Sequence, residues 1–512
     1  MKATLCNPCK GGCFLTIRLA RPAEALIASP YFQCVARTFF RAGPMEWGMI
    51  AIKNSFGQRH FGELDLGDVR RSRRLASLVD TMCRHPGGTL PDKLKEPKDL
   101  RAFYNLMNRD EVTHECLMKG HADETRRVIA SLPAGTVTLV LHDATELDYT
   151  SKRSLSDQLG QIGQGTHRGY ICHNSLAVTA GGETLGLVSQ VLHHRADVPE
   201  HETIKERRER ESRESRLWTQ GVKAGGPAPA GIRCVDVSDS LSDTFEYMAH
   251  EVTYGRQFVL RSREDRRLAE PTNGEKYLYD AVRSLASMGE RSVAVLPSPK
   301  REGRAVKMHV SHAAVTLNMP DKKLGDYANK PLKMWMVRVW EKKTPKDEDP
   351  LEWILLTNVP VETLADAQER IDWYERRVIV EEFHKGMKTG CGIETMQFEK
   401  IERLEPAIAV LSAMTTQLLR MRDAARAADA DTRPATEVVG AEYVEVLVSH
   451  YGKRMNAAPS IKQFFQHVAR LGGHQNRKCD GFPGWLTTWR GWMKLECMVD
   501  GYRAAHKRSG KR

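Results

Sequence analysis

The distribution of hydrophobic and polar residues divides the chain into a helical first part and a strand-rich middle. In the first part, LGDVRRSRRLASLVDTM has apolar residues at helical spacing, and Asp68 stands where a helix N-cap is expected. The segment HPGGTLP then interrupts the helix, and DLRAFYNLMN begins another. We therefore predict a small helical domain over residues 57–116.

From residue 136 the pattern changes to strands. TVTLVLHDAT is an apolar run that ends in Asp143, and GIRCVDVSDS is a second run that ends near Asp239. Asp236 and Asp243 are alternatives to Asp239, which we prefer because the strand is expected to stop there. Between the runs, SLAVTAGGETLGLVSQVL predicts a hairpin. Four more strand-like runs follow: RQFVLRSR, RAVKMHVSHAAVTL, LKMWMVRVWEKK and LEWILLTN.

A helix is predicted next, over YERRVIVEEFHKGMK, residues 374–388. On that helix, charged residues and one tyrosine fall on a stripe roughly 80° wide: Tyr374, Arg377, Glu381, Lys385 and Lys388. The opposite side carries Ile379, Val380, Phe383 and Met387, which predicts that it faces the core. The stripe therefore faces water or a ligand. A solvated face with ion pairs four residues apart is the alternative to a binding site.

Composition and charge narrow the class of protein. The chain has 512 residues, enough for about three domains, and a net charge of +12, which favours an anionic partner such as nucleic acid. It has no apolar run of membrane-spanning length, so we expect a cytoplasmic protein without a membrane partner. Eleven cysteines, an odd number, favour reduced thiols. A zinc site and a mis-assigned start at Met45 or Met49 remain alternatives for the first segment, which contains Cys6, Cys9, Cys13 and Cys34.

Four arginines crowd the first turns of the helix that follows Asp68: Arg70, Arg71, Arg73 and Arg74. Cations are unfavourable at a helix N-terminus by about 0.3 to 1 kcal/mol each. A phosphate partner would explain this placement, and an exposed structural face is the alternative.

Three acidic residues separated in sequence suggest a metal site. Asp143 and Asp239 close two strands, and Glu381 lies on the later helix. Turn or capping aspartates are the alternative for the first two. Three converging carboxylates could hold a pair of Mg²⁺ or Mn²⁺ ions, which prefer oxygen ligands. Such a pair supports in-line phosphoryl displacement, with Arg377, Lys385 and Lys388 gripping phosphates beside it.

The spacing of Tyr374, Arg377, Glu381 and Lys388 matches the YREK signature of bacterial DDE transposases of the insertion-sequence-four (Tn-five-like) family. Other ordered segments also resemble that family, namely FGELDLGDVRRSRRLASLV, HDATELDY, VSDSLSDTFEY, LEWILLT and VARLGGHQNRKCDGFPGWLTTWRGW. The resemblance implies an α/β fold with an RNase H-like core, interrupted by a β insertion. It further implies an N-terminal extension (1–46), a helical DNA-binding domain (47–116), a catalytic domain (117–428, insertion at about 255–360) and a helical dimerisation domain (429–512).

The resemblance also implies an activity and residue roles. The expected activity is cut-and-paste transposition by a homodimer, which binds the inverted repeats at the transposon ends, hydrolyses a phosphodiester and joins the 3′-hydroxyl to target DNA. Asp143, Asp239 and Glu381 would bind two Mg²⁺ ions, which Mn²⁺ can replace. Residues expected on DNA are Tyr374, Arg377, Lys385, Lys388 and Trp353, the last of which would stack on a flipped base. Val378 departs from the family, whose best-known member has an aromatic residue there. A catalytically silent DNA-binding relative and an RNase H-like nuclease that does not transpose are the alternatives.

Overall fold

The computed structural model describes residues 55–163, 165–195, 212–295, 304–320, 330–342, 350–477 and 483–509, together with residues 203, 206 and 210. The predicted N-terminal extension, with its four cysteines, lies outside these ranges. No helix of the described residues is long and apolar enough to cross a membrane.

The first described residues form the predicted helices. These are α1 (Phe56–Phe61), α2 (Val69–Arg84), α3 (Leu90–Lys93), α4 (Pro97–Met107) and α5 (His114–Ala130). Asp68 caps α2 as predicted, since its Oδ1 accepts from the Arg70 N–H at 2.8 Å. The apolar side of α2, which includes Leu75, Leu78 and Val79, is buried. Helical periodicity and one capping residue thus suffice to define α2.

One mixed sheet runs through the molecule. Its first half consists of β1 (Val137–Asp148), β2 (Gly160–Gln161), β3 (Arg168–Thr179), β4 (Thr184–His193), β5 (Arg233–Ser238) and β6 (Gln257–Arg261). The main strands lie in the order β4–β3–β1–β5–β6. β3 is antiparallel to both β1 and β4, whereas β1, β5 and β6 are parallel to one another. The hairpin predicted from SLAVTAGGETLGLVSQVL is confirmed as β3 and β4.

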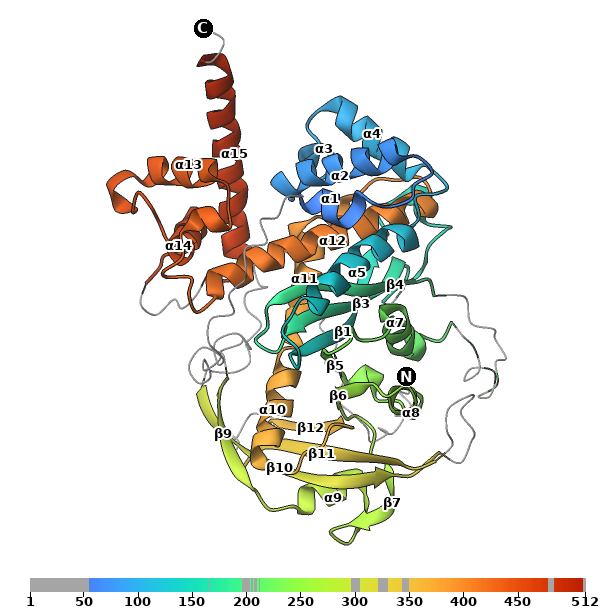
Figure 1. Cartoon of the computed structure of the whole chain (residues 1–512). Coiled ribbons are helices and arrows are strands. Elements are labelled where there is room, and N and C mark those ends of the chain that lie inside the picture. Colours follow the sequence, from blue (N-terminus) through green and yellow to red (C-terminus); the bar gives the residue numbers. More distant parts are fainter. Residues whose placement is uncertain are drawn as a thin grey trace, which may run out of the picture.

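The same sheet continues into a segment inserted between β6 and α10. This insertion contains β7 (Arg267–Thr272), β8 (Glu275–Tyr277), α9 (Leu278–Ser284), β9 (Gly289–Val295), β10 (Arg304–Leu317), β11 (Leu332–Glu341) and β12 (Glu352–Thr357). β12 pairs antiparallel with β6 and so joins the two halves of the sheet. The runs predicted as strands appear as β6, β10, β11 and β12. The insertion lies at the end of the molecule opposite α1–α4 (Figure 1).

Helices cover both faces of the first half of the sheet. α5, α11 (Val378–Lys385) and α12 (Ile401–Arg426) lie on one face, and α7 (Leu217–Gly225) lies on the other. α8 (Phe245–Thr253) packs near β6, and α10 (Leu364–Glu375) runs beside the insertion. α12 is buried along most of its length, and the N-terminal helices pack against it.

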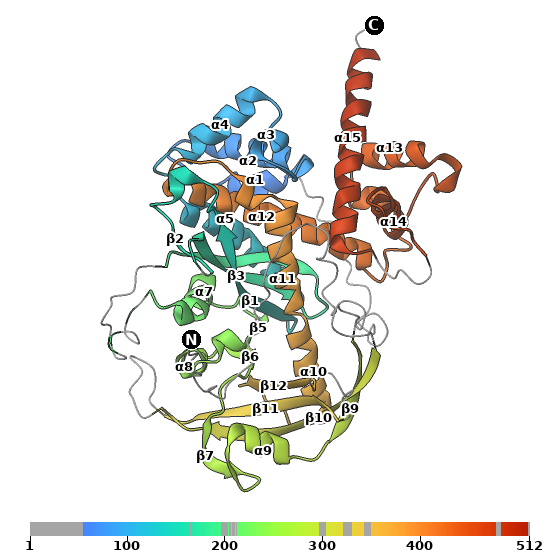
Figure 2. The ribbon, with the colours of Figure 1, turned by 180° about the vertical axis from the view of Figure 1, so that it is seen from behind.

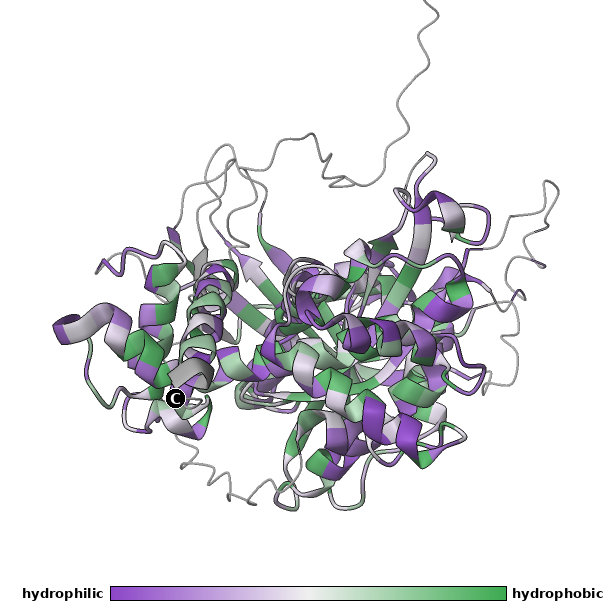
Figure 3. Ribbon diagram, turned by 90° about the horizontal axis from the view of Figure 1, so that it is seen from above, coloured by the Kyte–Doolittle hydropathy of each residue, from purple (hydrophilic) through white to green (hydrophobic). Residues whose placement is uncertain are grey.

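The last described part is helical, with α13 (Ala441–Tyr451), α14 (Ile461–Leu471) and α15 (Trp485–Ser509). It stands beside α1–α4, and α15 projects away from the sheet (Figure 2). α14 and α15 approach closely at two glycines, because a Cβ on Gly491 would lie 1.7 Å from the Val468 carbonyl oxygen. Seen from above, the helices carry both hydrophobic and hydrophilic residues (Figure 3), as expected for elements packed on one side.

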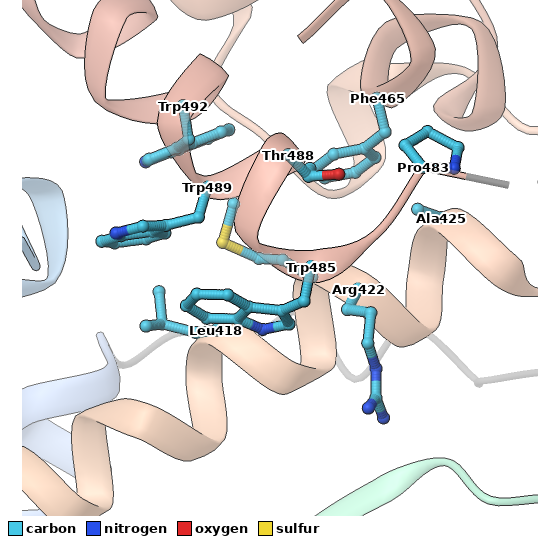
Figure 4. Close-up of a pocket in the computed structure, with 10 residues that line it drawn as sticks. Leu418, Arg422, Ala425, Phe465, Pro483, Trp485, Thr488, Trp489 and Trp492 are labelled. Carbon is cyan, nitrogen blue, oxygen red and sulfur yellow. The ribbon is translucent and has the colours of Figure 1, made fainter. Parts of the chain in front are cut away.

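Three tryptophans on one face of the last helix, Trp485, Trp489 and Trp492, have a structural role. Trp489 and Trp492 are buried, and Trp492 stacks on Tyr443 with ring centroids 5.2 Å apart. Trp485 stacks on Trp489 and lines an apolar pocket between α12, α14 and α15 (Figure 4). These tryptophans therefore belong mainly to the core of the C-terminal part.

Candidate functional site

Asp143 lies in the middle of a strand. We predicted that the strand ends there, but β1 continues to Asp148, because β3 pairs with it over its whole length. Asp143 lies beneath α11 and is half-buried, with 14% of its side chain exposed. One of its oxygens, Oδ1, accepts from the Ala144 N–H at 3.0 Å. The other, Oδ2, faces the helix that carries Glu381.

Asp239 is the first residue after β5, as predicted. Its Oδ1 accepts from the Leu241 N–H at 3.1 Å and caps a 3₁₀ turn, Ser240–Ser242. β1 and β5 are parallel, and their last paired residues are His142 and Ser238. The next residue of each strand is therefore an acid, and the two acids are neighbours.

The competing aspartates are engaged elsewhere. Asp236 is buried on the opposite face of the sheet, where it lies 2.8 Å from His142 Nε2 and 2.9 Å from Arg256 Nη2. Asp243 pairs with Arg266 at 2.6 Å. Neither carboxylate faces Glu381, so the geometry favours Asp239 as the neighbour of Asp143.

Arg377 links the acids of the sheet to Glu381. Its Nη1 lies 3.2 Å from Asp143 Oδ2, and its Nη2 donates to Glu381. Asp239 lies close enough to interact electrostatically with both Arg377 and Glu381. The structure thus brings Asp143, Asp239, Glu381 and Arg377 into one cluster, which we call the acidic cluster.

The single helix predicted over residues 374–388 is wrong in detail. α10 ends at Glu375 and α11 begins at Val378, with a tight turn between them. In this turn the Arg377 N–H donates to the Tyr374 carbonyl, three residues back. A π-helical turn, Gly386–Gly390, follows α11. The predicted core side is nevertheless confirmed, because all four of its apolar residues are buried.

The members of the stripe have different surroundings. Tyr374 is only 8% exposed, so the prediction that it faces water or a ligand is wrong for this residue. Its ring packs edge-on against Trp353 of β12, with centroids 6.0 Å apart. Trp353 itself is half-buried beside α10, and Tyr374 is close enough to Arg377 and Asp239 of the acidic cluster to interact with them electrostatically. Lys385 is exposed, and Lys388 lies 3.6 Å from Glu394.

Burial and mutual repulsion shift the protonation equilibria of the acidic cluster. Burial raises the pKa of Asp143 to about 7, opposed by Arg377 and reinforced by Asp239 and Glu381. Burial also raises the pKa of Asp239, with Arg377 opposing and Glu381 adding to the shift. These acids raise the pKa of Arg377 in turn. Three carboxyl groups therefore share one cation, an arrangement that favours additional positive charge.

The described residues contain no set of three or more His, Cys, Asp or Glu side chains in a ready metal-holding arrangement. In the acidic cluster the Arg377 guanidinium bridges Asp143 and Glu381 instead. The donor set is nevertheless suitable for a hard cation, since it consists of carboxylate oxygens.

Sequence reasoning missed one residue beside the acidic cluster. His384 lies on α11, and its Nδ1 is 4.0 Å from Asp143 Oδ2. Its Nε2 is 3.1 Å from the Asn174 side-chain amide on β3. Burial, together with Lys388 and Arg377, lowers the pKa of His384 to about 3, so the imidazole is neutral. Only its position three residues after Glu381, one helical turn, could have indicated it.

The four arginines of α2 fall into two groups. Arg71 lies 3.2 Å from Glu111, and Arg74 lies 2.6 Å from Asp99, so both are used within the domain. Arg73 is exposed, and the Arg70 side chain is 86% exposed despite its ion pair with Asp68. Arg70 and Arg73 therefore remain the better candidates for contact with a polyanion.

Comparison with known protein families gives independent information on the same helices. Residues 53–112 match a family model described as transposase DNA-binding. The matched range contains α1–α4 and the four arginines. This match supports a transposase that binds DNA, and hence a DNA-processing enzyme. The match therefore supports DNA binding by the N-terminal helices.

Proposed function

We propose that the chain is a cut-and-paste transposase of the insertion-sequence-four group, with Asp143, Asp239 and Glu381 as its catalytic acids. The observation that carries the proposal is the acidic cluster, in which these acids meet although they lie far apart in sequence. The match of residues 53–112 to a transposase DNA-binding model supports it independently.

The proposed core is RNase H-like. In support, β4–β3–β1–β5–β6 lie in this order, β3 runs antiparallel to the other four of these strands, and the first acid is on the central strand. The insertion separates Asp239 from Glu381 in the sequence, as the resemblance implies. It adds strands to the outer edge of β6, so it leaves the acids together.

In the proposed reaction, Asp143, Asp239 and Glu381 would hold two Mg²⁺ or Mn²⁺ ions. When bound, such ions activate water and stabilise the attacking and leaving oxygens of an in-line displacement. Arg377 would give up its contacts with the acids and bind a phosphate oxygen, to which a guanidinium can donate twice. Lys385, which is exposed, and Lys388 would add charge along the DNA backbone.

Trp353 and Tyr374 would bind the end of the transposon DNA. Trp353 is half-buried and its ring packs edge-on against Tyr374, so an aromatic pair is already held where an unstacked base would stack. Base stacking on an aromatic side chain is worth about 1 to 3 kcal/mol. Joining two ends to one target requires two active sites, and we propose that a homodimer, formed through the C-terminal helices, provides them.

The test is cleavage of a donor duplex that carries the ends of the element, with Mg²⁺ or Mn²⁺. We expect Asp143→Asn, Asp239→Asn and Glu381→Gln to abolish cleavage and to retain end binding. Asp157→Asn is the matched control, because Asp157 is exposed and outside the acidic cluster. Cleavage that survives all three substitutions would refute the assigned triad.

A second candidate is a catalytically silent DNA-binding relative. The observation that favours it is the Arg377 bridge, because the guanidinium contacts Asp143 and Glu381, two of the acids proposed to hold the ions. Tight end binding with no nicking in either metal would support this candidate. Cutting without end preference or strand transfer would instead indicate a nuclease that does not transpose.

A further inference from the structure

A line of hydrogen-bonded side chains, two histidines and two amides, runs over one face of the sheet from β4 to β3 and ends at the acidic cluster. It begins at His114, the first residue of α5, whose Nε2 lies 3.0 Å from Gln190 Oε1. Gln190 Nε2 then donates to Asn174 Oδ1 at 2.7 Å, and Asn174 Nδ2 meets His384 Nε2 at 3.1 Å. Asn174, Gln190 and His384 are all buried. In such a line each hydrogen bond can be assigned a direction, from its donor to its acceptor.

Fixed acceptors determine that direction. The Cys172 main-chain oxygen can only accept, and it lies 3.3 Å from Asn174 Nδ2. The Asn174 Oδ1 must then accept from Gln190, whose Nε2 also donates to Ser412 Oγ at 2.9 Å. The group that Asn174 presents to His384 is thus a donor. His384 Nε2 is consequently the acceptor.

A neutral imidazole with an accepting Nε2 carries its proton on Nδ1. In this protein that N–H is the one directed toward Asp143 Oδ2, 4.0 Å away. Among the residues that the structure describes, the Ala144 N–H donates to Asp143 Oδ1 and the Arg377 guanidinium donates to Oδ2. If Arg377 moves to a phosphate, His384 is the donor left beside Oδ2.

We propose that His384 is a positioning residue for Asp143, and that Asn174 and Gln190 fix its proton on the nitrogen that faces this carboxylate. The proposal rests on the proposed function, because it assigns His384 to the same active site. Hydrogen-bonded partners that orient a ligand commonly change metal affinity or activity by 10- to 100-fold. His384 and Asn174 would have this role without touching the DNA.

The first experiment determines the tautomer. Full-length protein labelled with ¹⁵N-histidine is measured by NMR without divalent metal, and His384 is assigned by the loss of its signals in His384→Gln. We expect the Nδ1–H tautomer, with Nε2 unprotonated. A proton on Nε2 in the wild-type protein would overturn the proposal directly, whether or not any variant folds.

The second experiment reverses the donor and acceptor roles in the hydrogen bond between residue 174 and His384. In Asn174→Asp, a carboxylate can only accept, so it should draw the proton to Nε2 and leave a bare Nδ1 facing Asp143. We expect end cleavage to fall by about 10- to 100-fold while DNA binding is unchanged. Asn476→Asp is the matched control, since Asn476 is exposed and distant from the line. Normal cleavage by a protein with the reversed tautomer contradicts a positioning role.

A Mn²⁺ titration separates this proposal from the proposed function. Paramagnetic Mn²⁺ bound by Asp143 should broaden the signals of His384 and of the neighbouring His142 and His173 while those of distant histidines such as His467 stay sharp, and Asp143→Asn should prevent the broadening. If the ring carries its proton on Nδ1 but Mn²⁺ leaves its signals sharp, the metal-binding part of the proposed function is wrong and the assigned tautomer stands.

Discussion

The two groups of α2 arginines should differ in their effect on DNA binding. The first perturbation is Arg70→Ala combined with Arg73→Ala, which removes the two exposed guanidinium groups. The matched control is Arg71→Ala combined with Arg74→Ala, which removes the same charge from side chains held by Glu111 and Asp99. A net-charge effect alone would therefore act equally on both variants.

The expected magnitude follows from counterion release. Each phosphate contact contributes about −0.9 to the slope of log K against log salt on B-DNA. Losing Arg70 and Arg73 should make the slope shallower by about 2. Between 50 and 200 mM salt, the wild-type affinity should then fall about tenfold further than that of the variant. Arg70 must leave Asp68 to bind, but an ion pair this exposed contributes little to stability and is easily exchanged for a phosphate contact.

The assay is fluorescence anisotropy of a labelled random-sequence duplex, titrated with full-length protein at several salt concentrations. Because the slope reports phosphate contacts, the assay does not require the sequence of the terminal repeats. The control variant should keep the wild-type slope and lose some thermal stability. Equal slopes for the wild type and Arg70→Ala/Arg73→Ala, or the same loss in both double variants, would refute the division of the arginines.

Three further predictions concern other parts of the molecule. Burial raises the pKa of Glu496 to about 8, so the folded state retains a proton that the unfolded chain has released. The free energy of unfolding should therefore fall between about pH 4.5 and 8, with a ceiling of about 5 kcal/mol from this residue, and Glu496→Gln should make the decline measured in urea titrations smaller by that contribution. Gly491→Ala should destabilise the chain by about 1 to 3 kcal/mol, because the added Cβ would meet the Val468 carbonyl oxygen. Gly501→Ala has open space around it and should be neutral, or stabilising by up to about 1 kcal/mol, in the same titrations. Equal effects of the two substitutions would contradict the close approach of α14 and α15. Trp353→Ala should slow processing of the cleaved end more than first-strand nicking on gels, and uniform slowing would argue for a purely structural tryptophan.

The sequence predicted most elements whose signals are local. The apolar runs that became β10, β11 and β12 were recognisable because period-two alternation and β-branched residues do not depend on distant contacts. Asp68 was likewise recognisable as a cap from its position before a helical pattern. The end of β1 was misplaced, because its extension to Asp148 depends on pairing with β3.

The details of the site were less predictable, because they arise from distant parts of the chain. Nothing between Tyr374 and Lys385 is a helix breaker, so the turn before α11 has no local signal. At this turn Arg376 contacts Ala180 and Arg377 contacts Asp143, and these partners lie 196 and 234 residues away in the sequence. The contact between Asn174 and His384 joins residues 210 positions apart, so no local sequence pattern could predict it.

The pairing of β12 with β6 has a consequence for shortening this protein. Deleting the insertion would leave Gln257–Arg261 as an unprotected edge, with main-chain donors and acceptors open on one side. Such edges recruit other strands and lead to aggregation. A minimal version of the enzyme would therefore need a substitute cover for this edge, such as a short helix or charged side chains, before its chemistry could be studied in isolation.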